Sequence, residues 1–121
     1  MKEVCIIDDD RLQQMINSRM VKKYIEYSTI SVYSNAAEVI KLIEKDYEPD
    51  LIFLDLKMSG MSGFEFLAKL QYINANLDVV VVSSSIDPND IERSRSFPNV
   101  LGYVTKSVTK DKLEKVIDLG K

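Results

Sequence analysis

The sequence Val4-Cys5-Ile6-Ile7-Asp8-Asp9-Asp10 sets four apolar residues directly before three aspartates. A continuous apolar run without alternation predicts a strand that is buried on both faces, as in a parallel sheet covered by helices. Two further runs have the same character, Leu51-Ile52-Phe53-Leu54 and Val79-Val80-Val81-Val82. Stretches with β-branched and aromatic residues at 30–33 and 102–105 predict two more strands. The pattern therefore predicts five strands.

Helix-period segments lie between these runs. Helices are expected at 11–24, from 36 to about 47, at 64–73, from 88 to the break at 98–99, and after Thr109, the last containing Lys112, Leu113, Val116 and Ile117. The expected N-caps are Asp10, either Ser34 or Asn35, Asp87 and Thr109. Strands alternating with helices predict an α/β fold: a doubly wound, five-stranded parallel sheet with helices on both faces. We take the flavodoxin-like order 2-1-3-4-5 as the expected one; if it holds, strands 1, 3, 4 and 5 are consecutive neighbours.

Composition limits the classes of protein to consider. The 121 residues fit one domain spanning 1–121, since most domains have about 100–150 residues. The net charge of −3 gives no electrostatic argument for nucleic-acid binding. The absence of histidine excludes Ser-His-Asp and Cys-His nucleophile pairs and His-ligated zinc. With short apolar runs, no leader pattern and only one cysteine, Cys5, we expect a cytoplasmic protein without a membrane span, and Cys5 to be a buried strand residue.

Chemically useful side chains follow four of the predicted strands. They are Asp8, Asp9 and Asp10 after the first strand, Asp55 after the third, Ser83 after the fourth and Lys106 after the fifth. Ligands of such sheets bind outside the carboxyl ends of the strands, where the strand order reverses. We therefore expect carboxylates, a hydroxyl and an ammonium group to meet at one edge, with Asp10 serving mainly as a helix cap.

Clustered carboxylates repel one another unless a cation lies between them, and Mg²⁺ prefers such hard oxygen ligands. A carboxylate can also attack phosphorus and form an acyl phosphate. A lysine and a metal ion would then neutralise the phosphoryl oxygens, and the Ser83 hydroxyl would donate to one of them. The residue types thus point to phosphoryl chemistry with Mg²⁺.

The whole chain resembles the receiver domain of two-component response regulators. The resemblance rests on Ile7-Asp8-Asp9-Asp10, Leu54-Asp55-Leu56-Lys57-Met58-Ser59-Gly60-Met61-Ser62-Gly63, Val82-Ser83-Ser84-Ser85 and Gly102-Tyr103-Val104-Thr105-Lys106. It implies that Asp55 is the phosphoacceptor, with Mg²⁺ held directly by Asp9 and Asp55, by the main-chain carbonyl of Lys57 and, through water or directly, by Asp8. By the same resemblance, Lys106 binds the phosphoryl group, and Ser83 and Tyr103 are the switch residues.

The resemblance also implies partners and a mode of action. The phosphoryl group would come from a phosphohistidine on a sensor histidine kinase or a histidine phosphotransfer protein. The surface formed by the fourth helix, fifth strand and fifth helix would then signal a downstream effector protein. Such a domain is not an enzyme with repeated turnover, since it only transfers a phosphoryl group to itself and later loses it by hydrolysis.

Two positions depart from the usual pattern of the family. Ser59 stands where a proline is usual in the loop after the phosphoacceptor, and Ser107 stands where a proline follows the lysine. In the family that second proline is typically cis. A cis bond costs more before serine than before proline, so we expect either a retained cis Lys106–Ser107 bond or a trans bond with a changed loop. Of the two we favour cis, since surrounding structure can enforce such a bond at a functional site.

Three other classes of protein fit parts of the pattern. Asp8-x-Asp10 superficially matches the two-aspartate motif of haloacid-dehalogenase phosphatases, but Leu12 replaces the expected Thr or Val and the chain is short for a cap. A flavodoxin-like electron carrier would need a phosphate-binding loop where three aspartates stand. An interaction domain of receiver fold with an inert site is the third alternative.

Overall fold

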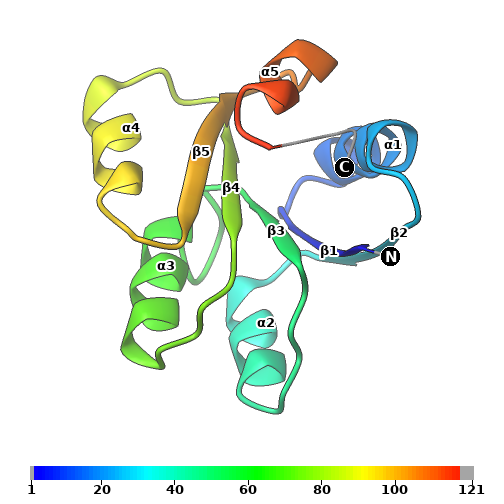
Figure 1. The fold of residues 1–121 in the computed structure, drawn as a ribbon. Coiled ribbons are helices and arrows are strands. Elements are labelled where there is room, and N and C mark those ends of the chain that lie inside the picture. The colour runs from blue at the N-terminus through cyan, green and yellow to red at the C-terminus, as the bar shows by residue number, and fades with distance from the viewer. Residues whose placement is uncertain (1, 118–121) are drawn as a thin grey trace.

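The computed structural model (Figure 1) describes residues 2–117, so that residues 1 and 118–121 of the predicted domain lie outside the described part. Within that part, five parallel strands form one sheet in the order β2-β1-β3-β4-β5, which confirms the predicted fold. The elements in chain order are β1 (Lys2–Ile7), α1 (Arg11–Tyr24), β2 (Ser28–Tyr33), α2 (Ala36–Ile43), β3 (Leu51–Leu54), α3 (Gly63–Tyr72), β4 (Val79–Ser83), α4 (Pro88–Arg95), β5 (Val100–Thr105) and α5 (Lys110–Glu114).

An apolar core layer lies on each face of the sheet, and β4 contributes side chains to both layers. Val79 and Val81 belong to the layer under α2 and α3, whereas Val80 and Val82 belong to the layer under α1 and α5. Successive side chains of a strand point to opposite faces, so a strand with an apolar residue at every position serves both layers. Burying each valine contributes roughly 1.5–3 kcal/mol. The continuous apolar runs therefore become the central strands.

The helix starts agree with the predicted caps. Asp10 caps α1 by accepting hydrogen bonds from the N–H groups of Leu12 and Gln13 at 2.9 and 3.4 Å. Asn35, not Ser34, caps α2, and Asp87 and Thr109 cap α4 and α5. These oxygens satisfy N–H groups that have no partner inside the helix.

Helix α4 ends at Arg95, shortly before the predicted break at 98–99, and two other helices end well before the predicted residue. Helix α2 ends at Ile43, and Tyr47 packs on the core from the turn that follows, where Asp46 adopts a positive φ of 72°. Helix α5 ends at Glu114, so Val116 and Ile117 pack on the core from beyond it. In both places the helical spacing of apolar residues continues past the helix, because a tight turn keeps the chain on the same side of the core.

Cys5 occupies the predicted place in the core. Its side chain is fully buried in β1, under α2 and α3. Burial disfavours the thiolate and raises the pKa of the Cys5 thiol to about 12. The thiol is therefore protonated at neutral pH.

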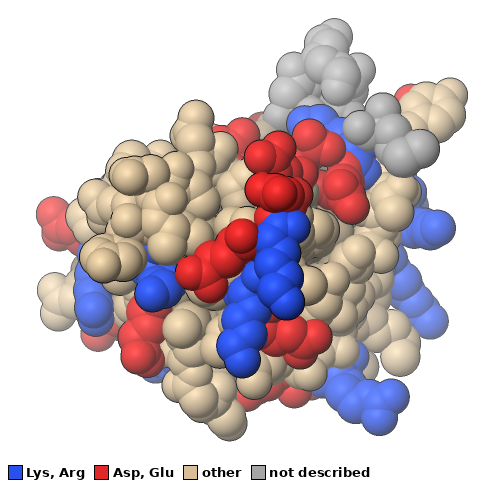
Figure 2. Space-filling view, turned by 90° about the horizontal axis from the view of Figure 1, so that it is seen from below, with Lys and Arg blue, Asp and Glu red and all other residues tan. Residues whose placement is uncertain are grey.

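Charged side chains of both signs lie on the face that is seen from below Figure 1. Figure 2 shows acidic and basic side chains next to one another in the middle of that face. Among residues 2–117, no helix has both the length and the apolar character that crossing a membrane requires.

Candidate functional site

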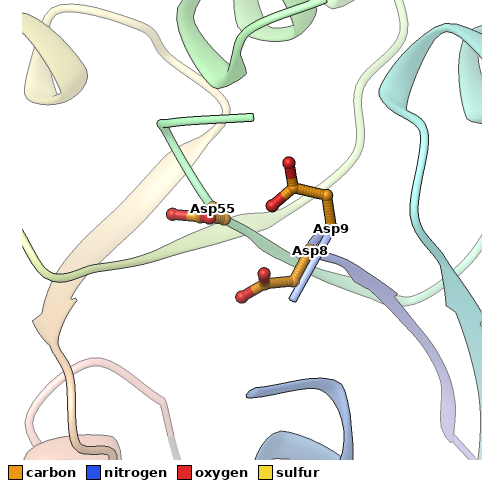
Figure 3. Close-up of side chains that lie close together, drawn as sticks. All are labelled: Asp8, Asp9 and Asp55. Atoms are coloured by element: carbon orange, nitrogen blue, oxygen red, sulfur yellow. The ribbon is translucent and has the colours of Figure 1, made fainter. Parts of the chain in front are cut away.

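Three aspartates meet where β1 and β3 end. The two strands pair in parallel with Ile7 opposite Leu54, and the N–H of Asp55 continues the ladder by donating to the carbonyl of Ile7 at 3.0 Å. Asp8 and Asp55, one residue beyond each strand, are therefore neighbours. One carboxylate oxygen from each of Asp8, Asp9 and Asp55 lies within 4.8 Å of the others, and Figure 3 shows the side chains reaching into the same space.

Backbone N–H groups hold these carboxylates in place. Asp8 Oδ1 accepts a hydrogen bond from the N–H of Asp10 at 2.9 Å, and Asp9 Oδ2 accepts one from Ser59 at 3.0 Å. The second bond ties the end of β1 to the loop after Asp55. Asp8 and Asp55 are only 1% and 6% exposed, whereas Asp9 is exposed. A set made only of carboxylate oxygens fits a hard cation such as Mg²⁺.

Lys106 brings a positive charge into the cluster. Its Nζ lies 3.0 Å from Asp8 Oδ2 and 3.5 Å from Asp55 Oδ2, so it contacts both buried carboxylates. The N–H of Lys106 donates to the carbonyl of Ser83 at 2.9 Å, which ties the end of β5 to the end of β4. The Lys106–Ser107 bond is cis, as predicted.

The surroundings of Asp55 disfavour its ionised form. Its burial, and secondly the carboxylate of Asp8, raise the pKa of Asp55 above its ordinary value of 3.8. Lys106 and the N–H of Lys57, which lies 3.5 Å from Asp55 Oδ1, act in the opposite direction without cancelling the rise. A bound cation would relieve this repulsion.

We expect Asp55→Asn to unfold at higher urea concentration than the wild type at neutral pH without metal. A raised pKa in the folded state means that ionisation of Asp55 favours the unfolded chain, so stability is lost as pH rises from 3.8 through the raised pKa. The advantage of the variant should therefore shrink at about pH 3, where both states are protonated. Urea denaturation in EDTA at both pH values measures it. Asp78→Asn, at an exposed aspartate before β4, is the control. An Asp55→Asn protein less stable than wild type at neutral pH would contradict the prediction.

The predicted switch residues are linked through Ser85. Ser83 is fully buried and its Oγ accepts a hydrogen bond from the N–H of Ser85 at 3.2 Å. The Tyr103 hydroxyl donates to the carbonyl of Ser85 at 2.8 Å. The Ser85 hydroxyl donates to Asp90 Oδ2 in α4 at 2.6 Å. Ser85 thus connects β4, β5 and α4.

The contacts of Ser85 and of Lys112 were not predicted from the sequence. Two features of the sequence could have indicated the contacts of Ser85. It follows Ser83 by two residues, and its partner Asp90 is an acidic residue in the first turn of α4. The sequence pattern places Lys112 in a helix and predicts no contact for its side chain, whereas in the structure its Nζ contacts the chain on both sides of Lys106. The atom of Lys57 that is predicted to bind the metal ion is its main-chain carbonyl oxygen. In the structure the N–H of the same residue faces Asp55.

Gly63 allows the loop after Asp55 to close. A Cβ at this position would lie 2.5 Å from the carbonyl oxygen of Asp55 and 2.6 Å from the Cα of Leu56. We expect Gly63→Ala to lower the free energy of unfolding by about 1–3 kcal/mol, because backbone must move to make room. Urea denaturation measures it. Gly60→Ala is the control. A Cβ there would have no atom from beyond the two neighbouring residues within 4 Å, and only the positive φ of 74° opposes it, costing roughly 1–2 kcal/mol. A Gly63→Ala protein as stable as wild type would contradict the prediction.

Comparison with known proteins defines the class. Residues 4–118 match the response regulator receiver domain family, and the chain belongs to this family. It is 26% identical over 121 residues to sporulation initiation phosphotransferase F of Bacillus subtilis, covering all of this chain and 93% of that protein. It is also 26% identical over 118 residues to the probable C4-dicarboxylate response regulator DctR of Priestia megaterium, covering 95% of this chain and 50% of that protein.

Solved structures of response regulators have a similar fold. A DNA-binding response regulator of the LuxR family from Staphylococcus aureus has a TM-score of 0.82 and 26% identity, covering 96% of this chain and 95% of that one. The N-terminal domain of a response regulator/sensory box/GGDEF protein from Carboxydothermus hydrogenoformans has a TM-score of 0.80 and 27% identity, covering 95% and 90%. The chain spans half or less of several of the curated relatives that it matches.

Proposed function

We propose that residues 1–121 act as one receiver domain in which Asp55 accepts a phosphoryl group, with Mg²⁺, from a phosphohistidine on a sensor histidine kinase or histidine phosphotransfer protein. The observation that carries this proposal is the position of Asp55: nearly buried, beside two further carboxylates, and 3.5 Å from the ammonium group of Lys106. A relative named as a phosphotransferase and others named as response regulators support it.

In the proposed transfer, a carboxylate oxygen of Asp55 forms a bond to phosphorus while the bond from phosphorus to the imidazole nitrogen breaks. Lys106, which in the resting protein contacts Asp8 and Asp55, pairs with a phosphoryl oxygen in the product. Asp8, Asp9, Asp55 and the Lys57 carbonyl would hold Mg²⁺. When bound, the ion supplies positive charge for the phosphoryl oxygens.

The proposed protein is an acceptor and not an enzyme with turnover. One phosphoryl group enters for each Asp55 and leaves by hydrolysis. A haloacid-dehalogenase-type phosphatase is not favoured, and a steady-state assay with a generic phosphate ester separates it, because only the phosphatase would release many phosphates per protein. An inert interaction domain would bind neither Mg²⁺ nor a phosphoryl analogue.

The proposed output is a change in the surface of α4, β5 and α5. When Asp55 carries a phosphoryl group, its oxygens become strong acceptors and the Ser83 hydroxyl turns to donate to one of them. The Tyr103 ring then moves into the space that Ser83 leaves. An effector protein that prefers one shape of this surface shifts the population toward it. We further propose that the domain acts in the cytoplasm without contacting nucleic acid itself.

Beryllofluoride, an analogue of the phosphoryl group, tests the metal part of this proposal. We expect it to bind only with Mg²⁺, and Asp9→Asn to weaken this binding by roughly tenfold or more, on the scale found for changes around metal ligands. Amide shifts followed during titration with and without Mg²⁺ measure the affinity. Asp10→Ser is the matched control, because it removes the neighbouring charge and keeps an oxygen for the cap of α1. Binding that does not depend on Mg²⁺, or that is unchanged in Asp9→Asn, would count against the proposal.

A further inference from the structure

Lys112 contacts the chain on both sides of Lys106. From the short helix α5, its Nζ donates to the carbonyl of Thr105 at 3.0 Å and to the carbonyl of Ser107 at 2.9 Å. These are the residues directly before and after Lys106. Both bonds have an ionised donor, which makes them stronger than bonds between neutral groups.

The Lys112 side chain starts from an ordered turn of the backbone and is partly covered. Lys112 is half-buried, and its N–H donates to the Thr109 hydroxyl at 3.3 Å, so that the cap of α5 fixes the turn from which the side chain starts. Lys112 has no acidic partner among the ion pairs of residues 2–117. Its ammonium group is directed at main-chain carbonyls.

The segment that carries Lys106 is therefore held from two sides. The N–H of Lys106 is bound to the carbonyl of Ser83 in β4, and the flanking carbonyls are bound to Lys112 in α5. A lysine side chain is long and flexible, and the position of its ammonium group depends on where the backbone starts it. A small displacement of a reacting or charge-neutralising group lowers transfer rates strongly.

We propose that Lys112 is a positioning residue for phosphoryl transfer to Asp55. It acts through Lys106, by fixing the backbone on both sides of it, and does not touch the phosphoryl group. The inference rests on the proposed function of Asp55.

The experiment compares single-turnover labelling by acetyl phosphate, at saturating Mg²⁺, in the full chain. Lys112→Met should lower the rate by roughly tenfold to a hundredfold, the range that a misplaced group produces. Lys112→Arg, which keeps a cationic donor, should stay within about threefold of wild type. Lys110→Met is the matched control: it removes one charge from the same helix, at an exposed lysine that faces Glu114 at 3.6 Å, and should change the rate less than about twofold.

A second comparison separates positioning from general destabilisation. In a Lys106→Met background, Lys112→Met should cause no further loss of rate, because its only route to the reaction is through Lys106. A loss of similar size in both backgrounds, or the same loss in Lys110→Met, would overturn the inference. Rates are compared per folded protein, and Lys112→Gln, which keeps a neutral donor, replaces Lys112→Met if that variant does not fold.

The two proposals fail in different ways. If wild type is not labelled at Asp55, the proposed function is wrong and the role of Lys112 falls with it. If wild type is labelled and Lys112→Met reacts at the wild-type rate, only the role of Lys112 is wrong.

Discussion

Asp55→Asn is expected to abolish labelling of the protein by acetyl phosphate or by a phosphohistidine donor. The amide nitrogen of asparagine is not nucleophilic toward phosphorus and its oxygen carries no full charge, so that no acyl phosphate forms. Intact-protein mass spectrometry after incubation with donor and Mg²⁺ measures the added phosphoryl group. Wild type should gain one group and the variant none.

The controls separate loss of the acceptor from loss of the fold. Asp78→Asn makes the same change at an exposed position before β4 and should be labelled like wild type. Circular dichroism should show that Asp55→Asn is folded, since removing a crowded charge stabilises it. Labelling of Asp55→Asn at the wild-type level would show that another residue accepts the group and would refute the assignment.

Ser83→Ala is expected to keep the binding of beryllofluoride with Mg²⁺ and to lose most of the response around Tyr103. The hydroxyl of Ser83, at the end of β4, can donate a hydrogen bond to the new acceptor. In the resting protein it accepts a hydrogen bond from the N–H of Ser85, and the carbonyl of Ser85 accepts one from the Tyr103 hydroxyl. Without the hydroxyl, the occupied site has no such connection to β5. Amide shifts of residues 100–105 and the affinity for an effector, each with and without the analogue, measure the response.

Two further variants serve as controls for Ser83→Ala. Ser83→Thr keeps the hydroxyl and should keep the response. Ser96→Ala removes a hydroxyl from the exposed end of α4, where it donates to the carbonyl of Arg93, and should leave the response unchanged. If Ser83→Ala responds around Tyr103 as wild type does, Tyr103 is merely packed against α4 in both states and the coupling follows another route.

Local pattern alone was enough to place the five strands, although β1, β2 and β5 each begin two residues earlier than predicted, and to place most helix starts. Continuous apolar runs at 4–7, 51–54 and 79–82 predict strands buried on both faces. Oxygen-bearing side chains directly before helical segments, such as Asp10 and Asp87, satisfy the first N–H groups. The carboxyl ends of parallel strands share one edge, so that Asp8 and Asp55, 47 positions apart in the sequence, were predicted to meet. These conclusions depend on periodicity and on one topological rule.

The tertiary structure alone decided how the groups at that edge are paired. Lys106 lies closer to Asp8 than to Asp55, Ser85 joins Ser83 to Tyr103 and α4, and Lys112 binds the carbonyls that flank Lys106. The same holds for the ends of α2 and α5, which stop before their apolar pattern does. Each of these features depends on the path of a loop and on the direction of a side chain, set by packing between segments far apart in the chain, and periodicity along the sequence contains neither.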